Sequence, residues 1–257
     1  MARQSVSFLE KIMHRRTMRR LRRYVRSADV TSLGLLRQQR NLAREMRVQI
    51  DELSYIAGER LALPVAGSNS LVTPRGTDWA WRPDIWRGPV AERGIVAIQS
   101  KSQIGNRVTL YHDCKISEMT MRQVRNTRER DLAPYGLRLD VFRFDGSFLS
   151  LAMDLPPEAC HGLRMKHLVR VDSIIEVEKP IEIFARLNIK HGPNIEQIVR
   201  EIPMSGGEQM VEFDLGYVKL NEKRIEKMWL DLIFEGPEMN QVTVRDITIC
   251  RHPRAEL

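Results

Sequence analysis

The run Tyr111-His112-Asp113-Cys114 places a base, an acid and a thiol next to one another. A Cys–His nucleophile pair requires the two side chains to converge in space. On a strand, His112 and Cys114 would share one face while Asp113 would point to the other. This alternation favours a pair of metal-ligating side chains, or a chance arrangement, over a catalytic triad. The interpretation we prefer is a strand-end cluster around a structural cysteine, because most structural cysteines are inert.

The other histidines give no stronger signal for a metal or a cofactor. His161, His167 and His191 lie near predicted turns or strand ends, without the HExxH or finger spacing of zinc ligands. The chain also lacks a GxGxxG, P-loop or GxSxG motif. We therefore expect no metal and no cofactor, and we favour a protein that is not an enzyme. The alternative is a jelly-roll hydrolase or lyase with His112, Asp113 or His191 in its site.

Tryptophan is concentrated in one short segment. Trp79, Trp81 and Trp86 are three of the four tryptophans and fall within eight residues, beside Arg82 and Arg87. Such a segment suits stacking on a sugar face or clamping a partner. Because buried tryptophans often dominate core packing, we favour a structural role in which they anchor the chain's entry into the folded domain.

The segment 181–190 has the clearest strand pattern, with apolar odd positions and mostly polar even positions. Its polar side presents Arg186 and Asn188. If segments 167–177 and 227–235 belong to the same sheet, further polar and aromatic residues reach that face. The residues that we expect to bind a ligand there are Arg186, Asn188, Trp229, Asp231 and Arg170, with Asp172 beside them.

Arginine, asparagine and aspartate around a tryptophan suit sugar hydroxyls, because they supply polar contacts next to an apolar platform. The alternative is an ordinary solvated face with cross-strand ion pairs. Alternation by itself favours that alternative, since it demands polar residues outside in any case. A saccharide or protein ligand for this face is therefore a hypothesis.

Short β-rich runs separated by turn signals fill the chain after residue 94, with no long helix between them. The candidates are 95–99, 107–111, 117–124, 137–144, 147–153, 167–177, 181–190, 195–202, 209–215, 227–235 and 241–250. Asp145-Gly146 is a two-residue hairpin signal, and only 217–226 suggests a short helix or a long crossing loop. The pattern predicts a mainly β protein with an antiparallel, jelly-roll-like β-sandwich.

The strand order from 167 onward resembles the galactose-binding-like jelly rolls of carbohydrate-binding modules. Those domains typically end with an apolar strand that contains an aspartate, similar to Val244-Arg245-Asp246-Ile247. The whole chain also resembles an uncharacterised family of alphaproteobacterial proteins. The segments that carry this second resemblance are Trp79–Pro83, Tyr111–Cys114, Leu187–Asn194 and Pro253–Leu257. That family implies no activity.

The net charge of +8 comes from one end of the chain. Residues 1–26 hold nine Lys/Arg with Glu10 as their only acid, while residues 27–257 are neutral overall. Over 6–26 the apolar residues take one broad arc of a predicted helix and most arginines the other. We expect this helix to dock on an anionic membrane or another polyanion. The arginines expected to make the contact are Arg15, Arg16, Arg19, Arg20, Arg22, Arg23 and Arg26. The alternative is a helix packed on the body with solvated arginines.

Residues 30–61 form a second predicted helix. Its apolar residues recur at spacings of three, four and seven, and they are Leu35, Leu42, Met46, Ile50, Leu53 and Ala57. This seam suits oligomerisation, or packing of the helix against a sheet. The Pro-, Gly- and Ser-containing segment 62–78 indicates a linker. We therefore expect a helical part, 1–61, and a β-sandwich domain, 79–257.

The composition is that of a folded protein: 42% hydrophobic and 29% charged residues exclude a disordered or collagen-like chain. Cys114, Cys160 and Cys250 are far apart and odd in number, as expected of reduced thiols. The N-terminal residues lack the apolar core of a secretory signal. We expect a cytoplasmic protein, peripheral at the inner membrane if the basic helix docks there.

Overall fold

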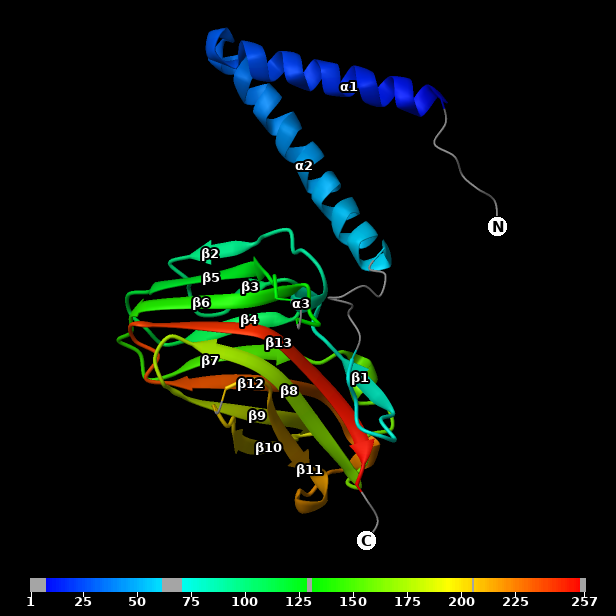
Figure 1. The fold of residues 1–257 in the computed structure, drawn as a ribbon, viewed down its shortest axis with the longest axis vertical. Helices are drawn as coiled ribbons and strands as arrows, with labels where there is room; N and C mark the ends of the chain where they lie inside the picture. Colours follow the sequence, from blue (N-terminus) through cyan, green and yellow to red (C-terminus); the bar gives the residue numbers. More distant parts are fainter. Residues whose placement is uncertain (1–7, 62–70, 129–130, 205, 255–257) are drawn as a thin grey trace. The chain divides into compact units, whose positions relative to one another are not determined.

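The structure is a computed structural model that describes residues 8–61, 71–128, 131–204 and 206–254. The chain divides into two units between Ser54 and Tyr55, and each is described by itself. The first unit holds α1 (Phe8–Ser27), a 3₁₀ turn, η1 (Ala28–Val30), and the start of α2 (Leu33–Leu61) (Figure 1). The helices predicted over 6–26 and 30–61 are present. The first part of the predicted linker, 62–70, lies outside the described residues.

The second unit is a sandwich of two antiparallel sheets, as the strand pattern predicted (Figure 1). The larger sheet has the order β11 (Gln209–Asp214), β8 (His167–Val177), β13 (Asn240–Pro253), β6 (Tyr135–Arg143), β5 (Glu118–Arg125) and β2 (Gly94–Val96), and β1 (Trp79–Trp81) pairs with β13. The smaller sheet has the order β10 (Asn194–Glu201), β9 (Glu182–His191), β12 (Ile225–Glu235), β7 (Leu149–Asp154), β4 (Val108–His112) and β3 (Ser102–Ile104).

Short helical turns connect these strands. They are α3 (Asp84–Arg87), η2 (Pro157–Ala159), η3 (Leu215–Tyr217) and η4 (Glu222–Arg224). The segment 217–226, predicted as a short helix or a crossing loop, therefore forms a connection with 3₁₀ turns. The sequence pattern missed the short strands β1 and β3.

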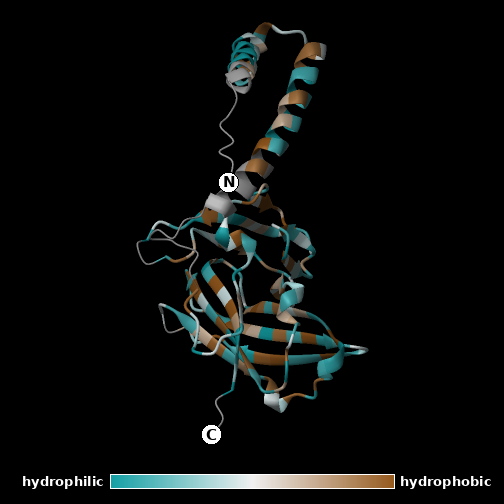
Figure 2. Ribbon diagram, turned by 90° about the vertical axis from the view of Figure 1, so that its right-hand side faces the viewer, coloured by the Kyte–Doolittle hydropathy of each residue, from teal (hydrophilic) through white to brown (hydrophobic). Residues whose placement is uncertain are grey.

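The core forms between the two sheets because the strands alternate. In β9 the odd positions Ile183, Ala185, Leu187 and Ile189 are fully buried. Hydrophobic and hydrophilic bands alternate along strands of the sandwich (Figure 2). In β13 the apolar positions change phase after Val244, because a bulge shifts the register between Val244 and Asp246. A bulge inserts one extra residue into a strand. The irregular spacing of this segment in the sequence is therefore the signature of that bulge.

The tryptophan-rich segment is anchored at the bulge. Trp86 of α3 is fully buried, and its Nε1 donates a hydrogen bond to the carbonyl of Val244 at 2.9 Å. Trp79 and Trp81 pack against the core from β1. The structural interpretation of this segment is confirmed by that burial.

Arg82 forms a deeply buried ion pair with Asp246 of β13. Its Nε and Nη2 donate to the two carboxylate oxygens of Asp246, each at 2.8 Å. The Arg82 side chain is only 2% exposed. A bidentate pair of this kind fixes both position and orientation, so it holds the entry segment against β13.

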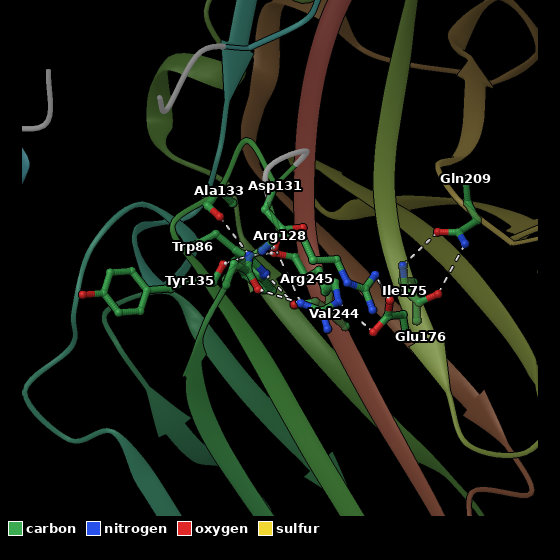
Figure 3. A network of polar contacts seen from close by, with 11 residues as sticks. Trp86, Arg128, Asp131, Ala133, Tyr135, Ile175, Glu176, Gln209, Val244 and Arg245 are labelled. Carbon is green, nitrogen blue, oxygen red and sulfur yellow. Dashed lines mark hydrogen bonds and ion pairs between the residues drawn. The ribbon is translucent and has the colours of Figure 1, made fainter. Parts of the chain in front are cut away.

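A second polar network surrounds the bulge from the sheet side (Figure 3). Arg245 donates from Nε to Glu176 of β8 at 2.7 Å, and Arg128 donates to the same carboxylate. The side-chain amide of Asn126 donates to the carbonyl of Arg245 at 2.9 Å. The extra residue of the bulge is thus held through both its side chain and its backbone.

We expect Asp246→Ala to lower the free energy of unfolding by about 3–5 kcal/mol, because it leaves the buried Arg82 guanidinium without its carboxylate. The matched control is Asp172→Ala, which breaks the half-exposed pair with Arg170 and should cost less than about 1 kcal/mol. Urea unfolding followed by circular dichroism measures both. Equal losses in the two variants would contradict the role assigned to the buried pair.

Candidate functional site

A groove of about 590 Å³ lies on the outer face of the smaller sheet. We call this feature the groove, and its walls come from four strands and one turn. The lining residues are Tyr111, Phe148, Ser150, Ala152, Asp154, Arg186, Lys190, Lys227, Trp229, Asp231 and Ile233. Strand pairing brings them together, because Arg186 of β9 lies opposite Asp231 of β12, which lies opposite Ala152 of β7.

The polar centre of the groove is Asp231, whose side chain is 5% exposed. Its Oδ2 accepts from Nε and Nη2 of Arg186 at 3.0 and 2.8 Å, and from Nδ2 of Asn188 at 2.9 Å. Asn188 in turn accepts a hydrogen bond from Gln197 of β10 at 2.9 Å. Three strands therefore fix one carboxylate and one guanidinium in place, and the guanidinium is partly exposed to the groove.

Aromatic side chains flank this centre. Trp229 is half-buried, with the Lys227 ammonium 5.7 Å from the centroid of its ring. Tyr111 and Phe148, on the other side of the groove, are 37% and 44% exposed. The small residues Ser150 and Ala152 line the groove between them.

The register gives the separation of these aromatic surfaces. Tyr111 is in line with Ile233, two strands away across β7, and Trp229 is four residues along β12 from Ile233. With ordinary strand spacing and rise, the Cα atoms of Tyr111 and Trp229 are roughly 16 Å apart. That distance exceeds one sugar ring and suits a chain of several.

The structure brings together most of the residues predicted from the polar face of 181–190. Segment 227–235 pairs with 181–190 as expected, so Arg186, Trp229 and Asp231 all line the groove. Asn188 belongs to the same cluster, but it is fully buried and so does not face solvent. It supports Asp231 from beneath the surface.

The placement of Arg170 on this face is wrong. Arg170 belongs to β8 of the larger sheet, where it binds Asp172 of the same strand at 2.7 Å. The two segments 167–177 and 181–190 follow one another in sequence, but the chain crosses from one sheet to the other between them. Period-two alternation places a residue on one side of its strand and gives no information about which sheet the strand joins.

Sequence reasoning missed several lining residues. The sequence analysis considered Tyr111 only as part of the run with His112. The period-two alternation of its strand could have indicated that Tyr111 faces outward. Phe148, Lys227 and Asp154 carried no local signal, because only the order β12-β7-β4 makes them neighbours.

The run from Tyr111 to Cys114 does not form a nucleophile pair. Nε2 of His112 lies 2.9 Å from the carbonyl of Ile98, and Nδ1 accepts from the backbone N–H of Cys114 at 3.1 Å. Both ring nitrogens are therefore engaged by backbone. Burial raises the pKa of the Cys114 thiol, and a protonated thiol is a poor nucleophile.

Asp113 of the same run holds the turn that carries Phe148. Its Oδ1 accepts from the backbone N–H of Ser147 at 2.7 Å and of Phe148 at 3.2 Å, and its Oδ2 accepts from the Ser147 hydroxyl at 2.6 Å. The Ser147 hydroxyl, together with these N–H groups, holds the pKa of Asp113 below its usual value.

The expectation that Asp145-Gly146 forms a hairpin is wrong. The turn joins β6 of the larger sheet to β7 of the smaller one, so the flanking strands do not pair. Gly146 is required here for space, because a Cβ atom would lie 2.5 Å from Oδ1 of Asp113. The close approach of the Asp113 carboxylate therefore explains why position 146 is a glycine. A type I′ or II′ hairpin turn does not explain it.

The described residues offer neither a metal site nor a membrane-spanning helix. In the part of the chain that the structure describes, no three His, Cys, Asp or Glu side chains are placed to hold a metal ion together. Nor do the described helices include one long and apolar enough to cross a membrane.

We expect Asp113→Asn to make the Ser147 and Phe148 amides exchange with solvent several-fold faster, because a neutral amide accepts these hydrogen bonds less strongly. Hydrogen exchange read by NMR measures the effect. Asp145→Asn is the control, since Asp145 accepts instead from the backbone N–H of Lys115. In the unaltered protein, the contribution of the Asp113 carboxylate to the stability of the folded state is fully present above the pKa that Asp113 has in the unfolded chain. It is lost as the pH falls through the lower pKa of the folded state. Unchanged protection in Asp113→Asn would contradict this assignment.

The fold has known neighbours among solved structures. The family 11 carbohydrate-binding module from Clostridium thermocellum, solved with a β-1,3-1,4-mixed-linked tetrasaccharide, is 14% identical; the match covers 63% of this chain and 97% of that chain with a TM-score of 0.40. A xylan-binding domain of family 22 is 8% identical, with 72% and 100% covered and a TM-score of 0.36. The enzymatically active domain of tailspike protein 4 from bacteriophage CBA120 is 7% identical, with 57% covered here, a TM-score of 0.39, and only 19% of that chain spanned.

No curated protein sequence matches the chain. A family model matches it over residues 1–257. The protein therefore belongs to DUF6478, a family of unknown function.

Proposed function

We propose that the sandwich binds a saccharide in the groove. The observation that carries this proposal is the Arg186–Asp231–Asn188 cluster, held by three strands between the Trp229 ring on one side and the Tyr111 and Phe148 rings on the other. Sugar rings present hydroxyls at their edges and C–H groups on their faces. A fixed donor and acceptor beside aromatic surfaces match both features.

The hydrogen-bond geometry leaves groups to recognise a hydroxyl. All three bonds to Asp231 end on Oδ2, so Oδ1 accepts none of them. Nη1 of Arg186 likewise takes no part in the pair. Because Asn188 and Arg186 already orient the carboxylate, a ligand would find the site preorganised, which lowers the entropic cost of binding.

The charges of the groove are balanced, which favours a neutral saccharide. Lys227 pairs with Asp154 at 2.8 Å, and Lys190 pairs with Glu226 at 2.7 Å. Arg186 pairs with Asp231. An acidic glycan would have to break these pairs to gain its own contacts, whereas a neutral glycan would not.

A protein partner is the alternative ligand, and a second cavity favours it. This cavity, of about 710 Å³, lies on the outer face of the larger sheet. Its exposed apolar residues Val96, Phe142 and Met239 stand beside Arg122 and Arg138. Scattered apolar and charged groups of this kind are typical of protein interfaces, where arginine, methionine and aromatic residues are enriched.

We expect Trp229→Ala and Arg186→Ala each to weaken binding of a neutral oligosaccharide at least about tenfold, because one removes the stacking surface and the other a charged hydrogen-bond donor. A glycan array with the full chain identifies the ligand, and calorimetry with that ligand measures the loss.

The matched control for these variants is Phe142→Ala, which removes an exposed aromatic side chain from the outer face of the larger sheet. It should bind like the unaltered protein. A ligand that both groove variants bind in full would place the binding surface elsewhere. A blank array would favour the protein partner.

We also propose that α1 docks on an anionic membrane surface, which would hold the protein at the inner face of the membrane. The arginines of α1 are exposed or half-exposed along its length, and so are Met13, Met18 and Val25. Arginines attract anionic headgroups while apolar side chains enter the interface. This combination supports a lipid surface over a free polyanion, because a polyanion has no apolar region in which these side chains could be buried.

We expect the substitution of four α1 arginines by glutamine to weaken binding to vesicles with anionic lipid by roughly 100-fold or more, since each arginine near such a surface contributes about 1 kcal/mol. The altered residues are Arg15, Arg19, Arg22 and Arg26. Vesicle sedimentation measures binding, which should also fall steeply with salt.

The control for the α1 variant replaces the same number of arginines by glutamine on the sandwich. Its altered residues are the exposed Arg93, Arg122, Arg143 and Arg200. Equal losses in the two variants would mean that net charge alone drives binding. Equal binding to neutral vesicles, or binding to nucleic acid but not to vesicles, would contradict the membrane proposal.

A further inference from the structure

The α2 helix exposes an apolar stripe that nothing in its own unit covers. With 100° per residue, Leu35, Leu42, Met46, Ile50 and Leu53 fall within an arc of roughly 80°. Leu35, Leu42, Ile50 and Leu53 are between 41% and 67% exposed. Among the described side chains from Met13 to Leu53, none is buried. A continuous stripe of this kind on a soluble helix marks an interaction surface.

The charges of α2 indicate what covers the stripe. In the sequence, the first half of the helix, 33–47, carries four arginines and one acid, whereas the second half, 48–61, carries three acids and one arginine. A second copy of the helix running in the same direction would place like charges together. A copy running in the opposite direction places the basic half against the acidic half.

The centre of the apolar stripe, from Leu42 to Ile50, has the symmetry that such a pairing requires. In an antiparallel pair related by a two-fold axis, each contact occurs twice with the roles of the copies exchanged. With the axis at Met46, Leu42 comes level with Ile50 of the second copy, and Glu45 comes level with Arg47. Farther from the axis the match is partial, because Leu35 comes level with Ala57 but Leu53 comes level with Gln39.

We infer that α2 pairs with α2 of a second copy of this chain, antiparallel and centred on Met46. The inference is independent of the saccharide and membrane proposals. The pairing buries both stripes, matches the charge of the two halves, and gives a closed dimer, because a two-fold contact uses the same surface on each copy.

Cysteine cross-linking in the full chain tests the direction and register. Met46→Cys should form a disulfide-linked dimer under mild oxidation, because the axis brings the two copies of residue 46 together. Leu35→Cys should not, because its two copies lie about 33 Å apart in the antiparallel pair. The unaltered protein controls for Cys114, Cys160 and Cys250. Cross-linking of both variants would overturn the inference in favour of a parallel pair.

Light scattering coupled to gel filtration tests the association itself. The unaltered protein should have twice the 29.9 kDa mass of one chain. Ile50→Asp should weaken the dimer at least tenfold. Asn41→Asp, which introduces the same residue away from the stripe, should leave the dimer intact, and circular dichroism checks that both variants stay helical. A monomer at all concentrations without Met46→Cys cross-links, or cross-links that require vesicles, would overturn the inference.

Discussion

The buried pair of Arg82 and Asp246 is the interaction on which the sandwich depends most. It joins the entry segment of the domain to the bulge of β13, the strand that pairs with β8, β6 and β1. Burial raises the pKa of Asp246, against the opposing effect of the Arg82 charge. Two charges removed from water are tolerated only when their geometry is excellent. The pair is therefore better understood as fixing the bulge in one place than as a large source of stability.

The bulge has consequences for the whole larger sheet. It shifts the phase of β13, so that apolar residues on both sides of it still face the core. It also leaves a backbone carbonyl, that of Val244, to accept from the buried Trp86. The polar network around Arg245 lies at the same bulge (Figure 3). The network joins β13 to β8 and to the segment before β6.

The smaller sheet is built differently, and the contrast explains why the groove lies there. Its outer face places small residues, Ser150 and Ala152, between larger ones on the neighbouring strands. Small side chains in the middle of a twisted sheet leave a hollow that aromatic residues on either side can frame. The charged groups of this hollow are paired within the protein, so the surface is polar without being strongly charged.

The helical unit obeys another physical rule. Helices without a core gain stability when something packs on their apolar side. Both helices show exposed apolar residues, but their charges differ: α1 is strongly basic, while α2 divides its charges between its halves. The first pattern complements a uniformly anionic surface, and the second complements an inverted copy of itself. One unit thus carries two separate surfaces.

The sequence by itself determined features that depend on neighbours along the chain. Alternation assigned Ile183 to the core and Arg186 to the outer face, charge counting separated the basic segment from the neutral body, and helical spacing found the stripe of α2. These signals are local, because the periods of strand and helix are fixed by backbone geometry. Only the tertiary structure decided that Arg170 joins the other sheet, that Asn188 is covered, and that Tyr111 and Phe148 line the same groove as Trp229. Sheet order and the closing of Asp113 on the 145–148 turn are set by packing between segments far apart in sequence, and residue pattern does not encode that packing locally.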